Sequence, residues 1–264
     1  MSVHRLLDMT WEEIRACSAT GAMAILPLGS VEQHGPHLPI KTDTALITAV
    51  VEATLARLPD DVQVALAPTC WLGASHHHLP FFALSVTERT YIDILTQLGT
   101  CLADGGFQRL FILNGHGGNT APLRVALNEI RRVRPAFLVA AAEYWSLGKP
   151  VIEAIRTSHT GGTGHAGEVE TSLMLHLAPN AVKNHELLTA RIPCLPTGFE
   201  RDLVSGGPVS LAMAWDQLSA SGVLGDPGQA TADKGQRFFD GIVNAVVEAL
   251  LTFYTLDPSA LQAA

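Results

Sequence analysis

Short apolar runs alternate along the chain with longer segments in which apolar residues recur every three or four positions. Apolar runs of about four to eight residues are typical of buried strands, and the longer periodic segments are typical of helices with one buried face. Strands are predicted at 22–28, 62–68, 110–113 and 136–143. Helices are predicted at 44–58, 87–104, 120–133, 167–177 and about 230–252.

This order of strands and helices predicts an α/β fold. Strand–helix–strand units build a three-layer sandwich, with a mostly parallel central sheet and helices on both faces. A chain of 264 residues suits one such domain, so we expect residues 1–264 to fold as a single unit. Ligands bind such sheets at the edge formed by the carboxyl ends of the strands, so polar loops that follow the strands are expected to meet there.

The stretch 193–228 breaks the pattern, because proline and glycine recur throughout it. A loop of this length is usually functional or disordered. Phe199 and Trp215 within it favour order, with the aromatic rings packed either over a site or against a neighbouring subunit.

Composition narrows the classes of partner. Hydrophobic residues make up 47% of the chain and charged residues 16%, which favours a homo-oligomer that covers part of its own surface. The formal charge is −8, and the only basic run, 131–134, is typical of a solvated helix end. A nucleic-acid partner is therefore not expected.

Neither a membrane partner nor disulfide bonds are expected. The chain has no apolar run of about 18 residues and no segment with the pattern of a signal peptide. Its four cysteines are widely spaced among apolar neighbours and form no C-x-x-C pair. Cys17, Cys70, Cys101 and Cys194 are thus expected to be reduced thiols, as in a cytoplasmic protein.

Carboxylates and imidazoles gather in the loops after two predicted strands. Glu32, His34 and Asp43 follow the first, and His116 follows the strand at 110–113. These ligand types suit zinc, manganese or iron, and the absence of nearby thiols favours a catalytic over a structural metal site. Another interpretation is a polar turn in which Asp43, or Thr42 beside it, caps the next helix.

A third segment, 161–175, spans the junction of a polar loop and a predicted helix and adds His165, Glu168 and Glu170. Apolar residues follow Glu170 at three, four and seven positions, so its carboxylate should be buried and in need of a partner. Glu168 has a threonine and a serine at the nearer positions and can remain in solvent at the start of the helix. Glu170 is therefore the better candidate ligand.

Three consecutive histidines, His76, His77 and His78, follow Ser75. In an extended segment, consecutive side chains point to opposite sides, so the three cannot all bind one ion. For His76 and His77, a role at a further metal ion and a chance polar role both remain open.

Several of these segments together resemble the creatininase family of metal hydrolases. The similarity lies in residues 29–39 and the Thr-Asp pair 42–43, in Ser75 and the histidines after it, in 114–119, in 165–172 and in 225–232. It implies a creatininase-like fold with two divalent ions per chain. Asp43 would bridge the ions, Glu32 and His116 would complete one ion, and His34 would bind the other.

The resemblance also implies hydrolysis of an amide bond by a metal-bound hydroxide, with His165 protonating the leaving nitrogen. Creatininases proper carry a tyrosine and a metal-binding glutamate where this chain has Gly117 and Gly118, and Glu170 is the candidate for the missing carboxylate. A homo-oligomer, with a hexamer as the expected assembly, is also implied. The residues expected to bind substrate are Ser75, His78, Gly117 and His165.

Three functions follow from these observations. The first is a metal-dependent amidohydrolase acting on the C–N bond of a small amide, cyclic amides included. The second is a metal-dependent peptidase that releases a short C-terminal peptide, as in the mycofactocin-maturation branch of the family, which this chain resembles at Gly117 and Gly118. The third is an oligomeric metal-binding protein without turnover.

Overall fold

The computed structural model describes residues 3–184, 188, 192–193, 195–199 and 202–257. A five-stranded parallel sheet forms its centre, with strand order β1-β4-β2-β6-β7. Four of the strands match predicted apolar runs, whereas β1 is short and only partly buried and gave no such pattern. The strands are β1 (Val3–Arg5), β2 (Met23–Leu28), β4 (Val64–Leu66), β6 (Arg109–Asn114) and β7 (Leu138–Glu143).

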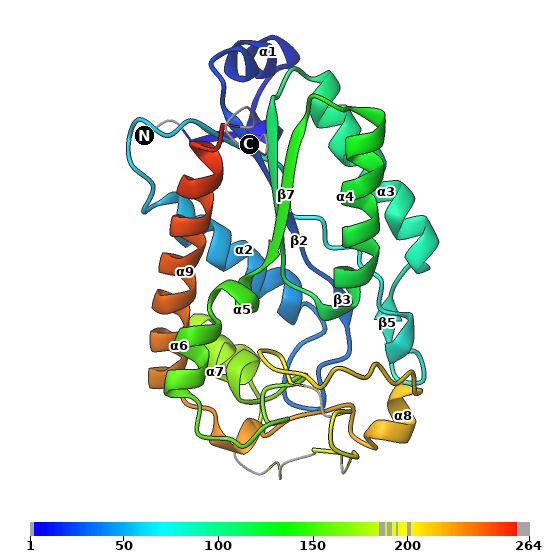
Figure 1. Ribbon diagram of the computed structural model, residues 1–264. Helices are drawn as coiled ribbons and strands as arrows, with labels where there is room; N and C mark the ends of the chain where they lie inside the picture. Colours follow the sequence, from blue (N-terminus) through cyan, green and yellow to red (C-terminus); the bar gives the residue numbers. More distant parts are fainter. Residues whose placement is uncertain (1–2, 185–187, 189–191, 194, 200–201, 258–264) are drawn as a thin grey trace, which may run out of the picture.

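Helices cover both faces of this sheet (Figure 1). Apolar side chains of α2 (Thr42–Leu55), α7 (Glu168–Leu177) and α9 (Ala232–Tyr254) form a core on one face. Those of α3 (Glu88–Asp104) and α4 (Thr120–Val133) form a core on the other face. The predicted three-layer α/β sandwich is therefore confirmed.

The shorter elements were not predicted, because each has too few residues to show a periodic pattern of apolar positions. One helix of this group, α1 (Trp11–Ala19), begins with a capping box in which the Thr10 and Glu13 side chains bond to each other's backbone N–H groups. The others are α5 (Tyr144–Leu147), α6 (Lys149–Ile155), α8 (Trp215–Leu218) and the 3-10 helices η1 (Leu6–Asp8), η2 (His76–His78), η3 (Gly117–Asn119), η4 (Pro179–Ala181) and η6 (Pro227–Gln229).

The register of the sheet brings three strand ends to one level. Leu28 at the end of β2 pairs with Asn114 of β6, and Asn114 pairs with Glu143 of β7. The loops after these strands therefore start side by side at one edge. In Figure 1 this edge lies below the sheet, at the end of the molecule away from both chain termini.

A second, two-stranded sheet extends the site edge. Strand β3 (Val31–Glu32) pairs antiparallel with β5 (Ala83–Leu84), and Glu32 lies opposite Ala83. This pairing ties the loop after β2 to the segment that follows the three histidines. Two-residue strands have no sequence pattern, so this sheet was not predicted.

No helix within the described ranges is long and apolar enough to span a membrane. Cys17, Cys70 and Cys101 are free thiols, and Cys194 lies outside the described residues.

Candidate metal centre

Five side chains predicted to bind metal converge at the carboxyl edge of the sheet. They come from β3 and the turn after it, from the first turn of α2, from the loop after β6 and from the first turn of α7. All are buried, with at most 6% of the residue surface exposed. They are Glu32, His34, Asp43, His116 and Glu170.

Asp43 lies between two imidazoles. Its Oδ1 is 3.0 Å from Nε2 of His34, and its Oδ2 is 2.9 Å from Nδ1 of His116. Each carboxylate oxygen thus faces a different histidine, an arrangement that suits a carboxylate shared by two cations.

The interpretation of Asp43 or Thr42 as a helix cap is wrong. Helix α2 begins two residues before the predicted start, its N-cap is Lys41, and no side chain caps it. The Thr42 hydroxyl donates to the carbonyl of Pro39 instead. Asp43 therefore lies inside the first turn, and its carboxylate faces the site.

The two glutamates of α7 have different surroundings. Glu170 Oε1 lies 3.9 Å from Nε2 of His34, and Glu170 Oε2 accepts a hydrogen bond from the backbone N–H of Ala166. Glu168 is also fully buried, so the prediction that it lies in solvent is wrong. Its charge is balanced by Lys234 of α9, whose Nζ lies 2.5 Å from Oε1.

The potential ligand atoms form three compact groups, and within each group all of them lie within 4.8 Å of one another. Two of these groups have no residue in common, and the third takes residues from both. The groups are Glu32–His77–His116, His34–Asp43–Glu170 and Glu32–His34–His165.

The buried carboxylates of this cluster need positive charge beside them. Burial raises the pKa of both Glu32 and Glu170. For Asp43, burial acts in the same direction, but His34 and His116 outweigh it and hold the pKa well below its usual value.

The carboxylates in turn shift the pKa of the two neighbouring histidines. Burial opposes the charged form of His34 and His116, but the carboxylates raise the pKa of His34 well above its usual value and that of His116 to about 9. Protons on these two rings supply the charge that the buried carboxylates need. A divalent cation supplies the same charge and displaces such protons when it binds.

Two oxygen atoms of the cluster fit a cation better than a hydrogen bond. Glu32 Oε1 and Asp43 Oδ2 are buried and make no hydrogen bond within the described part of the chain. Imidazole nitrogens approach them to 3.0 and 2.9 Å, but the angles are not those of hydrogen bonds. Buried carboxylate oxygens without donors are costly, and coordination of a metal removes that cost. The residues present therefore fit a metal centre.

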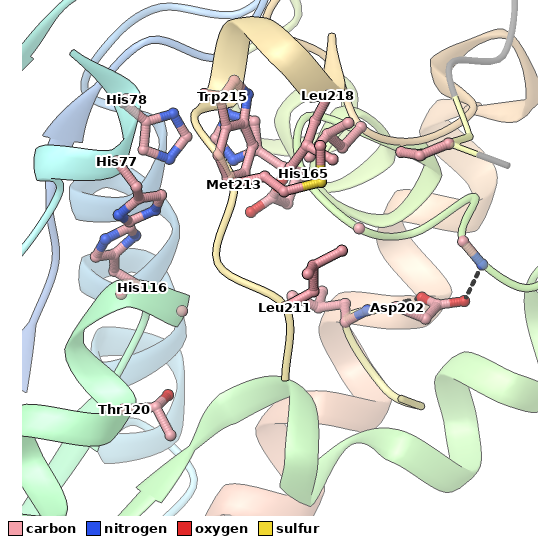
Figure 2. A pocket seen from close by; sticks show the side chains of 18 of the residues that line it. His77, His78, His116, Thr120, His165, Asp202, Leu211, Met213, Trp215 and Leu218 are labelled. Atoms are coloured by element: carbon pink, nitrogen blue, oxygen red, sulfur yellow. Dashed lines mark hydrogen bonds between the residues drawn. The ribbon is translucent and has the colours of Figure 1, made fainter. Parts of the chain in front are cut away.

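A cavity of about 610 Å³ opens over the cluster. Figure 2 shows His77, His78 and His116 along one side of it, and Leu211, Met213, Trp215 and Leu218 along another. The Trp215 ring packs 4.1 Å from the ring of His78 and 5.0 Å from that of His165. The expectation that this tryptophan packs over a site is confirmed.

Three of the four residues expected to bind substrate line the cavity, namely His78, Gly117 and His165. Ser75 is not among the lining residues. Its Oγ lies 2.6 Å from Oγ of Ser30 and 3.1 Å from Nε2 of His116, so its hydroxyl can orient His116 rather than meet a ligand.

The histidine triplet forms the 3-10 helix η2, not the extended segment expected from the sequence. Its three side chains nevertheless have different partners. Nδ1 of His76 lies 3.0 Å from the carbonyl oxygen of Val86, at the surface. Nδ1 of His78 lies 2.8 Å from Nε2 of Gln33, inside the site, and His77 faces the cavity.

Gln33 is a site residue that was not predicted from the sequence, because it carries no charge and is not among the usual zinc ligands. Its Oε1 accepts from the N–H of Gly35, and its Nε2 donates to the carbonyl of Gly222. These backbone partners fix the orientation of the amide, so Nε2 donates its second hydrogen to Nδ1 of His78. Only its place between Glu32 and His34 could have drawn attention to it.

The family model for creatinine amidohydrolase matches residues 7–250. The chain is 34% identical to the mycofactocin precursor peptide peptidase of Mycobacterium tuberculosis over 93% of both chains. It is 28% identical to the creatinine amidohydrolase of Pseudomonas putida, covering 92% of this chain and 94% of that one. A crystal structure of creatinine amidohydrolase superposes with a TM-score of 0.79 at 25% identity, covering 96% of this chain and 98% of that one.

The fold and nearly the whole length of the chain match, in agreement with the resemblance of the loops. This chain belongs to the creatininase family of hydrolases.

Proposed function

We propose that this protein is a metal-dependent amidohydrolase that binds two divalent ions and hydrolyses a C–N amide bond. The observation that carries the proposal is the pair of ligand groups, Glu32–His77–His116 and His34–Asp43–Glu170, which share no residue and lie side by side under one cavity. When bound, the ions would activate a water molecule and polarise the amide carbonyl.

His165 is the group proposed to move the proton. Its Nε2 donates to the main-chain carbonyl oxygen of Gln33 at 2.8 Å, so its lone pair is on Nδ1, which lies 3.7 Å from Glu32 Oε1. Burial lowers the pKa of His165 well below its usual value, and the ring is neutral. Its Nδ1 can therefore hold the proton that the attacking water loses and pass it to the leaving nitrogen.

Glu170 is proposed to act both as a metal ligand and as a catalytic carboxylate, in the place of the glutamate that creatininases proper carry where this chain has Gly118. The hydrogen bond from Ala166 orients its Oε2, which leaves Oε1 toward His34. The next turn of α7 after Glu170 belongs to the apolar core that α7 forms with α9.

A peptide substrate is the second candidate. A cavity of about 610 Å³ accepts a ligand larger than a small cyclic amide, and its apolar wall suits the side chains of a short peptide. The 34% identity to a mycofactocin precursor peptide peptidase supports release of a short C-terminal peptide. The creatinine amidohydrolase relative supports the small cyclic amide.

The test is metal content and turnover of wild type, of Asp43→Ala and of Asp93→Ala, each assayed on a panel of cyclic amides and of peptides. Asp93 is an exposed aspartate of α3 and serves as the matched control. Asp43→Ala is expected to lose both ions and all turnover, whereas Asp93→Ala keeps both. Full turnover by Asp43→Ala would contradict the proposal. Two tightly bound ions without hydrolysis of any substrate would instead favour a metal-binding protein without turnover.

Zinc, manganese and iron are the proposed metals. Solved creatininases of the same fold include a manganese form and a zinc–zinc form, which supports the first two. We also propose a cytoplasmic homo-oligomer, with a hexamer as the expected assembly. Exposed apolar side chains near β5 support self-association, including Trp71, Phe82 and Leu84 at 47 to 49% exposure. A monomer in sedimentation experiments would contradict it.

A further inference from the structure

We propose that His77 is an additional ligand of the metal ion held by Glu32 and His116. The inference rests on the proposed metal-dependent function and assigns one of the two histidines whose role the sequence left open. It adds an imidazole from a loop that none of the other proposed ligands occupies.

The geometry places His77 within reach of that ion. One nitrogen of its ring lies within 4.8 Å of ligand atoms of both Glu32 and His116. The rings of His77 and His116 are nearly parallel, with centroids 5.9 Å apart and an interplanar angle of 8°. Figure 2 shows the two rings side by side on the same side of the cavity.

His77 also has a free lone pair, unlike its neighbours in η2. His76 is held at the surface by Ser85 and Val86, and His78 is held by Gln33. Neither ring nitrogen of His77 forms a hydrogen bond with any residue that the structure describes, and its contacts are with other rings. A neutral imidazole always carries one unprotonated nitrogen, which is a good ligand for zinc, manganese or iron.

The surroundings of Gly118 give an independent reason. A Cβ at this position would lie 2.2 Å from the carbonyl oxygen of Ala74, 2.5 Å from Nε2 of His116 and 2.8 Å from Cε1 of His77. Backbone and two imidazoles therefore fill the space that a side chain at 118 would need. In this protein His77 of η2 lies beside His116, so a side chain that could bind the ion does not fit at position 118.

With His77 as a ligand, the two ions have equal numbers of protein ligands. Glu32, His77 and His116 lie on one side, and His34, Asp43 and Glu170 lie on the other, so each ion has three residues near it without counting Asp43 twice. Three protein ligands with a further open position are typical of catalytic zinc. His165 then remains free to act on substrate.

The experiment measures metal binding, not activity. Protein stripped with a chelator is titrated with Zn²⁺ by calorimetry against a competing chelator, for wild type, His77→Ala and His76→Ala. We expect two ions for wild type. His77→Ala should raise the dissociation constant of one ion by about 100-fold, since even partners that only orient a ligand contribute 10–100-fold.

The controls separate a ligand from a merely nearby residue. His76→Ala, altered one position away in the same 3-10 helix, should bind both ions as wild type does. Glu170→Gln should weaken the other ion, and its effect should add to that of His77→Ala. Unchanged affinity for both ions in His77→Ala would overturn the inference, even if the protein is a metal-dependent hydrolase. Wild type that binds no metal would overturn the hydrolase proposal as well.

A second measurement needs no variant, in case His77→Ala does not fold. X-ray absorption of wild type loaded with two zinc ions should detect three imidazoles shared between the two ions, from His34, His77 and His116. Two imidazoles shared between them would overturn the inference.

Discussion

The main-chain carbonyl oxygen of Gln33 lies 2.8 Å from Nε2 of His165 and accepts a hydrogen bond from it. A carbonyl can only accept, so this contact assigns the hydrogen of the neutral ring to Nε2. Nδ1 is then the nitrogen that faces the site, 3.7 Å from Glu32 Oε1. A single backbone contact thus determines which atom of His165 can exchange protons with a substrate.

Replacement of His165 by alanine should lower kcat by about 10²- to 10⁴-fold, the usual contribution of a positioned acid or base. Metal content should stay at the wild-type level, because the six residues of the two separate ligand groups remain. The measurement is kcat together with elemental analysis, with exposed His159→Ala as the control. Loss of one ion in His165→Ala would show instead that His165 binds metal, in the group it forms with Glu32 and His34.

Replacement of Gln33 by leucine should affect both stability and turnover. The change leaves the N–H of Gly35 and Nδ1 of His78 without their partner, and it removes one of two donors to the carbonyl of Gly222. Each buried polar group left unpaired costs about 1–3 kcal/mol. Denaturant unfolding should show a loss of at least about 2 kcal/mol, and kcat should fall because His78 is no longer held.

Gln97→Leu, on the exposed face of α3, is the matched control and should change neither quantity. A Gln33→Leu variant as stable and active as wild type would mean that water replaces the amide and that Gln33 does not position the site.

Replacement of Trp215 by alanine should raise KM more than it lowers kcat. The indole packs against His78 and His165, and its Nε1 donates to the carbonyl of Gly222, so it forms a wall of the cavity. Loss of the wall removes contact with substrate but leaves the proposed ligands in place. Steady-state kinetics on the best substrate would measure both constants. A fall in kcat at unchanged KM would show that Trp215 acts on the reaction step instead.

The sequence predicted the sheet and its main helices because their apolar patterns are long. It also predicted that Glu32, His34 and His116 lie at one edge of the sheet, since polar loops after parallel strands meet there. It could not distinguish the environments of Glu168 and Glu170 fully, because the partner of Glu168 is Lys234, 66 positions away. Nor could it predict that Gln33 bonds to Gly222, because contacts between distant loops leave no local pattern.

The Glu168–Lys234 pair makes a prediction about stability and pH. The carboxylate is buried and accepts hydrogen bonds from Lys234 and from the backbone N–H groups of Thr157 and Ser158. Burial alone would raise its pKa, but these donors, Lys234 foremost, hold it below the usual value. Removal of one partner of a buried pair leaves an unbalanced charge, so Lys234→Met should lose about 3 kcal/mol at pH 7.

The sign of the pH dependence follows from that lowered pKa. A carboxylate with a lower pKa in the folded than in the unfolded protein stabilises the fold fully above its unfolded pKa, and this stabilisation is lost as the pH falls through the folded pKa. The difference in unfolding free energy between wild type and Lys234→Met should therefore shrink as the pH falls below about 4.3, the pKa of an unperturbed glutamate. Lys149→Met, which removes an exposed pair with Glu153, should cost under about 1 kcal/mol. A difference for Lys234→Met that stays constant from pH 7 to the acid limit of folding would mean that its effect comes from packing and not from the charge of Glu168.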